Sequence, residues 1–448
     1  MRSAAESETL GYLRLAVFAL LASGGFVLVV AIARTPLVSL IVGRSYLQIA
    51  LVAHVVFALD VWLLSFVAVL WTLESARAGA ALAPSLAVPG LGLAWVGATM
   101  LAGVPLAGAG QPVMADYVPV LRHPIFLLGL VAFFTGIALP AIAYLLAAGR
   151  RSRSLSLEAS ALCWAAMAYL GGLAAFLLAG LRWGTTDHAG LVWGAGHLFQ
   201  VVNTAALVAA WLRLAPPLFR LEVWLVRACL GALGLAIALT LLVQLLPIPW
   251  GGVAMFFWAL IGLPVQAAWL VIVLGFVAGG RPLGPASPAR SFLLFSLALY
   301  AVGGLIAVPG LGSDTRVTAH YHGTVGAVTM AFMGLTYRFL PELGVPVVWR
   351  WGARVQPQLY GWGLLVLIAG LYFAGEAGTA RKIFESITTN PALLPAAMLF
   401  GAGALATVAG GVVFVVGVGL SLLVGPSQAS SAAPLVAPAP ASSGVVRS

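Results

Sequence analysis

The chain has 448 residues, of which 62% are hydrophobic and only 8% are charged. Soluble domains carry about a quarter charged residues, so this composition excludes a soluble protein. The formal net charge of +10 could indicate binding to nucleic acid. The arginines, however, stand in short loops between apolar stretches and form no basic stripe, so no nucleic acid partner is expected.

Apolar stretches of the length needed to cross a bilayer, about 20 residues, recur along the whole chain. The sequence predicts about twelve such spans, at approximately 11–34, 46–73, 87–109, 124–148, 157–181, 189–212, 224–246, 250–279, 290–309, 317–340, 357–375 and 392–424. The predicted fold class is therefore all-α, a polytopic bundle of about twelve transmembrane helices set in a lipid bilayer. Residues 1–425 form the helical domain, and the Ala-, Pro- and Ser-rich tail 426–448 is predicted to be disordered and cytoplasmic.

The arginines also predict an orientation. The loops near 77, 150–153, 213–227, 281–290 and 350–354 hold more of them than the alternate loops do. The positive-inside bias then places both termini in the cytoplasm of a bacterial-type inner membrane. The two cysteines, Cys163 and Cys229, lie inside apolar stretches and exclude a thiolate metal cluster or a disulfide framework.

All six histidines of the chain fall in the outer part of the predicted membrane region or at its edge. They are His54, His123, His188, His197, His320 and His322. Independently scattered histidines would rarely share one depth, and polar residues inside a membrane are costly. A shared functional site is the simplest explanation, with His123 and His188 better placed as solvated residues at helix entries.

The tenth predicted span opens with two histidines, His320 and His322, separated by one residue. Residues i and i+2 of a helix lie about 200° apart, so the two side chains point to opposite sides. One metal ion held by one helix prefers a spacing of three or four. This pattern instead suits two flat macrocycles, one on each flank, each taking one imidazole as axial ligand. Gly323, Gly326 and Ala327 would let planar groups approach the backbone.

Three segments carry a resemblance to the catalytic subunit I of the haem–copper oxidase superfamily. The tenth span, H-Y-H-G-T-V-G-A-V-T-M-A-F-M-G-L-T-Y-R-F-L-P-E-L-G, resembles that family most closely in its nitric oxide reductase and C-type branch. The second, A-L-V-A-H-V-V-F-A-L-D-V-W-L-L, and the sixth, L-V-W-G-A-G-H-L-F-Q, are similar to the family segments that supply further histidine ligands. The family has twelve spans and cytoplasmic termini, as predicted here.

The resemblance implies a set of haem-binding residues. His54 and His322 would bind the iron of a low-spin, b-type haem, and His320 would be the proximal ligand of a second, high-spin haem. His197 would face the open side of that second haem, with Trp193 one turn before it. In the loop G-T-A-R-K-I-F-E, Arg381 and Lys382 would pair with haem propionates.

The chain departs from the family at the second metal. The family's two adjacent histidines near the seventh span have no counterpart between His197 and His320, and neither the nitric oxide reductase glutamate nor a tyrosine one turn after His197 is present. One imidazole cannot hold copper, which needs three or four nitrogen or oxygen donors. The sequence therefore leaves open whether copper-dependent reduction of dioxygen extends to this chain.

The resemblance implies a haem-binding, subunit I-like protein of a respiratory oxidoreductase, with other membrane or cytochrome subunits as partners. Electrons would enter from cytochrome c or a quinol at the low-spin haem and pass to the second haem. They would end there, as in a terminal oxidase or nitric oxide reductase, or pass on in pure electron transfer. The alternative is a transporter or a haem-gas sensor without electron flow.

Asp60 is the only carboxylate deep inside a predicted span. It lies six residues after His54, about 120° around a regular helix from it. Its carboxyl could relay protons or form a hydrogen bond to a neighbouring span, and the sequence leaves both open.

Overall fold

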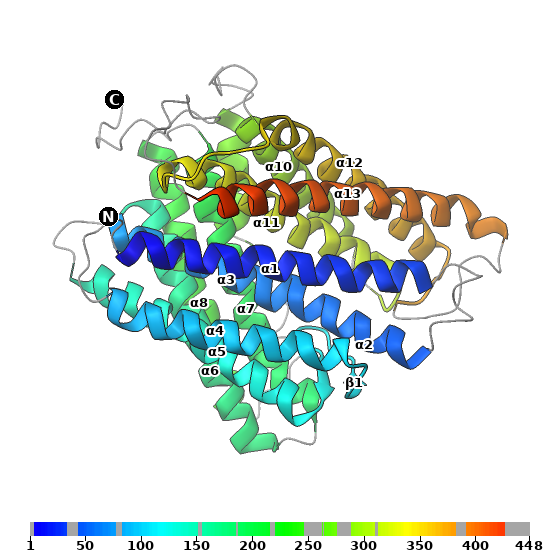
Figure 1. Cartoon of the computed structure of the whole chain (residues 1–448), viewed down its shortest axis with the longest axis horizontal. Helices are drawn as coiled ribbons and strands as arrows, with labels where there is room; N and C mark the ends of the chain where they lie inside the picture. Colours follow the sequence, from blue (N-terminus) through cyan, green and yellow to red (C-terminus); the bar gives the residue numbers. More distant parts are fainter. Residues whose placement is uncertain are drawn as a thin grey trace. The chain divides into compact units, whose positions relative to one another are not determined.

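The computed structural model describes residues 4–33, 44–77, 83–150, 155–184, 187–215, 220–245, 262, 264–275, 288–309, 312–381 and 391–425. Within these residues, ten helices are long and apolar enough to cross a membrane. The chain is an all-α polytopic membrane bundle (Figure 1), which confirms the predicted fold class. The tail 426–448 lies outside the described residues.

The chain divides into two compact units. Unit 1 consists mainly of residues 1–30 and 42–281. Unit 2 consists mainly of residues 282–442. Unit 1 contains α1 (Ala4–Ala33), α2 (Arg44–Val55), η1 (Val56–Val61), α3 (Trp62–Arg77), α4 (Ala83–Leu106), α5 (Pro124–Gly149), α6 (Leu157–Trp183), α7 (His188–Leu214) and α8 (Arg220–Leu245). Unit 2 contains α10 (Pro288–Ala307), α11 (Thr315–Glu342), α12 (Arg350–Glu376), the short 3₁₀ turn η3 (Pro391–Leu393) and α13 (Leu394–Val424).

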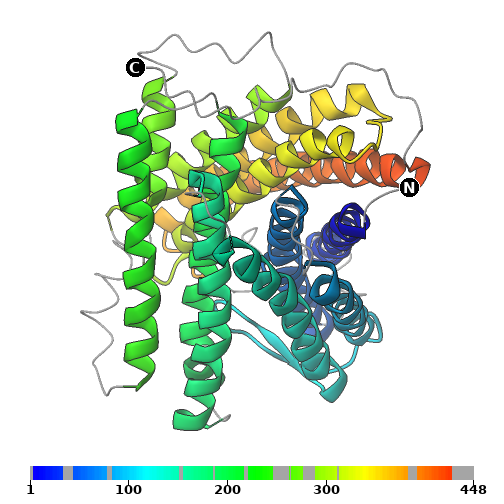
Figure 2. The same cartoon turned by 90° about the vertical axis from the view of Figure 1, so that its left-hand side faces the viewer.

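In unit 1, α4 lies against α5, and α6 lies against both α7 and α8. A short antiparallel hairpin joins α4 to α5, formed by β1 (Gln111–Val113) and β2 (Val120–Arg122), with Gln111 opposite Arg122. The hairpin is seen in Figure 2 as a pair of cyan arrows. In unit 2, the two main pairs are α10 with α11 and α12 with α13.

Most predicted spans coincide with a helix, and the exceptions have simple causes. For the eighth predicted span, 250–279, the described residues include the helical segment Pro264–Gly275, and most of the rest lies outside them. The tenth span corresponds to α11, which is not among the ten helices apolar enough to cross a membrane, since it carries polar side chains such as His320, His322 and Arg338.

The first helix begins earlier than the predicted start at residue 11. Helix α1 starts at Ala4, and Glu8 is only 3% exposed. The predicted span followed hydropathy, whereas the helix extends beyond it and packing buries Glu8. Asp60, which is 4% exposed, is therefore not the only buried carboxylate in unit 1.

The second predicted span is one continuous helical run with an irregular middle. Between α2 and α3, residues Val56–Val61 form the π-helical turn η1. A π-turn contains more residues than an α-turn, so the 120° offset predicted between His54 and Asp60 does not hold for this run. Such turns occur often at functional sites.

Close contact between α4 and α5 depends on glycine. A Cβ on Gly97 would meet the backbone nitrogen of Phe133 and would lie 2.6 Å from the carbonyl oxygen of Gly129. Backbone atoms cannot swing aside as a side-chain end can. Gly92, on the same helix, has nothing within 4 Å of the position that a Cβ would take.

We therefore expect Gly97→Ala to destabilise the protein by about 1–3 kcal/mol, the usual cost of overpacking. Gly92→Ala is the matched control and should be neutral or stabilising, because alanine favours helix over glycine. Thermal unfolding in detergent measures both. Equal thermal unfolding midpoints for the two variants would contradict the close contact between α4 and α5 at Gly97.

Candidate functional site

His54 lies on α2, two residues before the π-turn, and its side chain is hydrogen-bonded to Ser23 on α1. Its Nδ1 lies 3.1 Å from the carbonyl oxygen of Ser23 and 2.9 Å from the Ser23 hydroxyl. In the tautomer with the proton on Nδ1, this nitrogen donates to the carbonyl oxygen, which can only accept. The lone pair of the ring then lies on Nε2, the atom that coordinates a metal in this tautomer.

His320 and His322 on α11 are anchored in the same way. His320 Nδ1 donates to the carbonyl oxygen of Gly303 on α10 at 2.8 Å. His322 Nδ1 donates to the carbonyl oxygen of Thr318, one turn earlier on its own helix, also at 2.8 Å. Both rings are half-buried. The two imidazoles thus have different anchors, as expected for residues about 200° apart on one helix.

The bond from His320 requires α10 and α11 to approach closely. A Cβ on Gly303 would lie 2.8 Å from the backbone nitrogen of Thr324, and one on Gly323 would lie 2.6 Å from the Cα of Gly303. Gly323 was expected to leave room for a planar ligand. It instead allows this helix contact, and Gly326 faces the side chain of Leu364 on α12.

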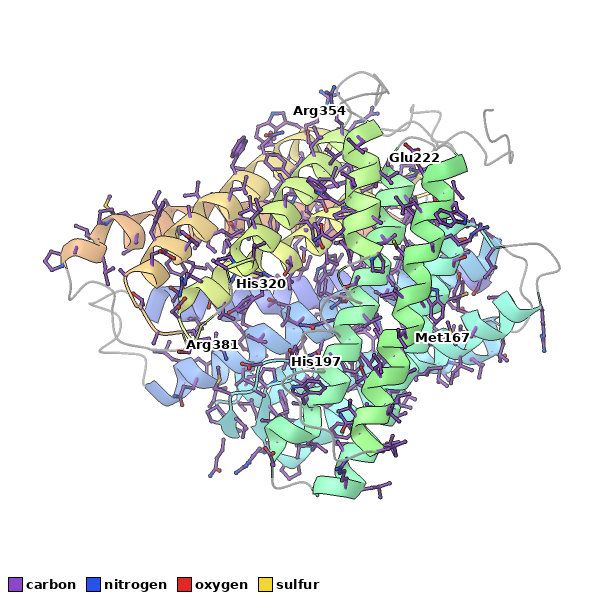
Figure 3. All side chains as sticks on the ribbon, turned by 180° about the vertical axis from the view of Figure 1, so that it is seen from behind. Met167, His197, Glu222, His320, Arg354 and Arg381 are labelled. Atoms are coloured by element: carbon purple, nitrogen blue, oxygen red, sulfur yellow. The ribbon has the colours of Figure 1, made fainter. Side chains whose placement is uncertain are left out.

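The loop after α12 is tied to the N-terminal end of α11. Asp314 and Ala380 form an antiparallel β-bridge, and the backbone nitrogen of Arg381 donates to Ser313 at 3.2 Å. In Figure 3, Arg381 lies toward the same end of unit 2 as His320, with Arg354 at the opposite end. Arg381 is therefore placed near the histidine end of its unit, and Lys382 lies outside the described residues.

Both ring nitrogens of His197 on α7 have a protein partner. Its Nδ1 donates to the carbonyl oxygen of Trp193 at 2.8 Å, and its Nε2 lies 3.2 Å from the hydroxyl of Tyr117. Since Nδ1 carries the ring proton, Tyr117 is the donor at Nε2. The indole of Trp193 also packs on the imidazole, with ring centroids 3.9 Å apart. His197 is 3% exposed.

Tyr117 was missed in the sequence because it lies 80 residues before His197. It belongs to the loop between β1 and β2, and two further contacts hold it. Its ring lies against Gly196, where a Cβ would meet it directly. His188 Nε2 donates to the neighbouring carbonyl oxygen of Val118 at 2.8 Å. Spacing along α7 gives no signal for a partner that comes from another element.

These contacts test the fit of a copper or non-haem iron at His197. The lone pair that would bind the metal accepts a hydrogen bond from Tyr117 instead. Within the described residues, no three His, Cys, Asp or Glu side chains lie together as a metal would need. The residues present do not fit a second metal there, whereas His54, His320 and His322 have the donor chemistry that haem iron takes.

The N-terminus of α11 is held by an ion-pair cluster outside the predicted span. Asp314 caps the helix by accepting from the backbone nitrogen of Arg316 at 2.8 Å. The Arg316 guanidinium hydrogen-bonds the same carboxylate and holds the pKa of Asp314 below its usual value. Arg316 also pairs with Glu376 at the end of α12, at 3.0 Å.

Comparison with known proteins supports the architecture. The fold is similar to that of a chain from a haem–copper terminal oxidase dimer determined by cryo-EM, with a TM-score of 0.78 over 98% of this chain and 87% of that chain. Sequence identity to it is 16%, so the likeness concerns the fold. The chain is thus a multi-pass membrane protein with the architecture of that oxidase chain.

Sequence relatives define the family. An uncharacterized protein of Aquifex aeolicus is 30% identical over 332 residues, covering 72% of this chain and 81% of the relative. The chain belongs to the family of this Aquifex protein. An uncharacterized protein of Rickettsia prowazekii is 30% identical over 138 residues, 28% of this chain and 27% of that protein. No family model matches the sequence.

We expect Asp314→Ala to lower the thermal midpoint, since loss of a helix cap costs about 1 kcal/mol. The effect should depend on pH. Because the folded pKa is depressed, the stability from this carboxylate is present above the ordinary aspartate pKa of about 4 and is lost as pH falls through the folded value.

The measurement is thermal unfolding in detergent at about pH 7 and at about pH 3 or lower, where carboxylates protonate. Asp314→Asn, which keeps a cap acceptor without the charge, is the control for the charge. An equal deficit of Asp314→Ala at both pH values would contradict the ion pair with Arg316.

Proposed function

We propose that the chain is the haem-binding, subunit I-like component of a respiratory oxidoreductase. His54 and His322 would hold a low-spin haem of b type, and His320 would hold a second, high-spin haem. Arg381 and Lys382 pair with haem propionates. Cytochrome c or a quinol is the electron donor, and further membrane or cytochrome subunits are partners in a bacterial-type inner membrane.

One observation carries this proposal: His320 and His322 each donate Nδ1–H to a backbone carbonyl oxygen at 2.8 Å. Metal-ligating histidines almost always donate their second nitrogen in this way, which fixes the tautomer and the ring orientation. His54 makes the equivalent bond to Ser23. The fold shared with a haem–copper oxidase chain supports the same assignment.

In this proposal, the haems supply one-electron chemistry, and the residues of the chain hold and tune them. The carbonyl bonds increase the basicity of each imidazole at Nε2. The Ser23 and Gly303 carbonyls belong to different helices from His54 and His320, so each ring is fixed relative to a neighbouring helix. A guanidinium such as that of Arg381 stabilises carboxylates such as propionates by charge-assisted hydrogen bonds.

The contact between Tyr117 and His197 favours one version of this function. A terminal reductase of the haem–copper type places a second metal on the open side of its high-spin haem, and here the corresponding imidazole is engaged by a phenol at 3.2 Å. We therefore propose electron transfer through the haems to a partner as the second candidate function. A colourless purified protein would instead support the transporter alternative.

The test is a pyridine-haem and metal assay on the purified protein and on single histidine variants. We expect bound haem with a sharp reduced alpha band and no copper. His54→Ala and His322→Ala should each abolish that band, because a low-spin iron needs both axial ligands. His320→Ala should spare it and remove any spectral response to carbon monoxide.

His123→Ala is the matched control and should leave the spectrum unchanged, since His123 only precedes α5 as its N-cap. Absence of any haem, or an unaltered alpha band in both His54→Ala and His322→Ala, would reject the haem assignment. Stoichiometric copper would reject the version without a second metal.

Adjacent glycines on α10 provide a sharper test of the His320 anchor. Gly303→Ala should separate α10 from α11 and lengthen the bond from His320 to the Gly303 carbonyl, so the spectrum of the haem on His320 and its carbon monoxide complex should shift. Gly304→Ala should have no effect, because nothing lies within 4 Å of a Cβ there. Identical spectra of both variants would exclude this anchor as a determinant of the site.

A further inference from the structure

The beginnings of α10 and α12 form an arginine-rich end of unit 2. Arg290 lies in the first turn of α10, and Arg350 and Arg354 lie in the first two turns of α12. All three side chains are exposed, and Figure 3 shows Arg354 at this end. Among the described residues, the only carboxylate at this end is Glu342, which pairs with Arg338 at 3.5 Å. Positive charge is therefore in excess here.

Side chains of α10 and α12 meet along two rows. On α12, Arg354, Gln358 and Trp362 follow one another at four-residue intervals, so they share one face of the helix. On α10, Ser291 and Phe295 are spaced in the same way. The Gln358 amide donates to the Ser291 hydroxyl at 3.3 Å. The rings of Phe295 and Trp362 meet edge to face, with centroids 5.5 Å apart. We call these five residues the α10–α12 seam.

The α10–α12 seam lies on the surface of the described structure. Arg354 and Gln358 are exposed, and Trp362 is 60% exposed. Leu294, next to Phe295 on α10, is 42% exposed. In both rows the polar side chains stand toward the start of the helix and the aromatic ones stand deeper in the predicted span. The seam is therefore polar at its outer end and apolar further in.

The order of side chains along the seam matches the order of chemical groups in a phospholipid. Trp362 lies eight residues after Arg354, which is about 12 Å along the helix axis. The polar region of one leaflet is only about 5–8 Å thick. When Arg354 lies at the level of the lipid phosphates, Trp362 lies beside the upper part of the acyl chains. Gln358 lies between them, near the ester carbonyls, which accept hydrogen bonds.

Two guanidinium groups stand at the outer end of the seam. Arg290 directly precedes Ser291, and Arg354 lies one turn before Gln358, so the bond between Ser291 and Gln358 brings the two arginine-bearing turns together. Neither arginine takes part in an ion pair within the described residues. Guanidinium binds phosphate by parallel charge-assisted hydrogen bonds. The sequence predicts that this end is cytoplasmic, where anionic lipids give the leaflet a negative surface potential.

We propose that the α10–α12 seam binds an anionic phospholipid of the leaflet at this end. Arg290 and Arg354 bind its phosphate, the hydrogen-bonded polar pair contacts its ester groups, and the aromatic pair packs against its acyl chain. The occupant is a lipid and not free phosphate, because only a lipid places hydrocarbon on the exposed indole. This site does not depend on haem, so it and the haem assignment can fail separately.

Fluorescence quenching by brominated lipids tests the proposal on the full chain in phosphatidylcholine vesicles. Brominated phosphatidylglycerol and brominated phosphatidylcholine are added at equal mole fractions, and the difference between wild type and Trp362→Phe isolates the emission of Trp362. We expect phosphatidylglycerol to occupy the seam in preference to phosphatidylcholine. Arg290→Gln and Arg354→Gln should each lower this preference about fivefold, the contribution of one arginine near an anionic surface. High salt should lower it as well.

Arg227→Gln is the matched control, because it removes an equal charge from an exposed position on α8 in unit 1, and it should keep the wild-type preference. Arg354→Lys, which retains the charge, should recover most of it. The proposal is overturned if both lipids quench Trp362 equally, or if the double variant of Arg290 and Arg354 keeps the preference. Quenching of Trp362 by neither lipid would also overturn it, since another polypeptide would then cover the seam.

Discussion

The hydrogen bond from a histidine Nδ1 to a backbone carbonyl oxygen is the interaction on which the candidate site depends. His54, His320 and His322 each make it, with distances between 2.8 and 3.1 Å. A ring that donates in this way avoids the cost of a buried N–H without a partner and carries its lone pair on Nε2. In the proposed function, these half-buried imidazoles would be preorganised as ligands of haem iron.

His197 makes the same hydrogen bond from Nδ1 to a backbone carbonyl, but Tyr117 contacts its other ring nitrogen. There Tyr117 donates to Nε2. One phenol thus occupies the ligand atom that a second metal would require. The chain has the architecture of a haem–copper oxidase chain, but the described residues around His197 do not supply the donor set for copper. Electron transfer without a second metal is therefore the second candidate function.

Polar groups in unit 1 follow a common rule. A buried donor or acceptor in a membrane protein must find a partner inside the bundle, since lipid supplies none. Most do so, as Tyr12 and Tyr169 show by donating to carbonyls of other helices. Within the described residues, Glu8, Asp60 and Ser65 each retain an oxygen without a hydrogen-bond partner.

The sequence by itself determined the membrane fold, because hydropathy is a local property and a span needs only enough consecutive apolar residues. It also placed His320 and His322 on opposite flanks of one helix, since 3.6 residues per turn is fixed geometry. Tertiary structure decided the rest. The partner of His320 lies 17 residues away and that of His197 lies 80 residues away. The burial of Glu8 and the π-turn at Asp60 likewise depend on packing, which no local pattern encodes.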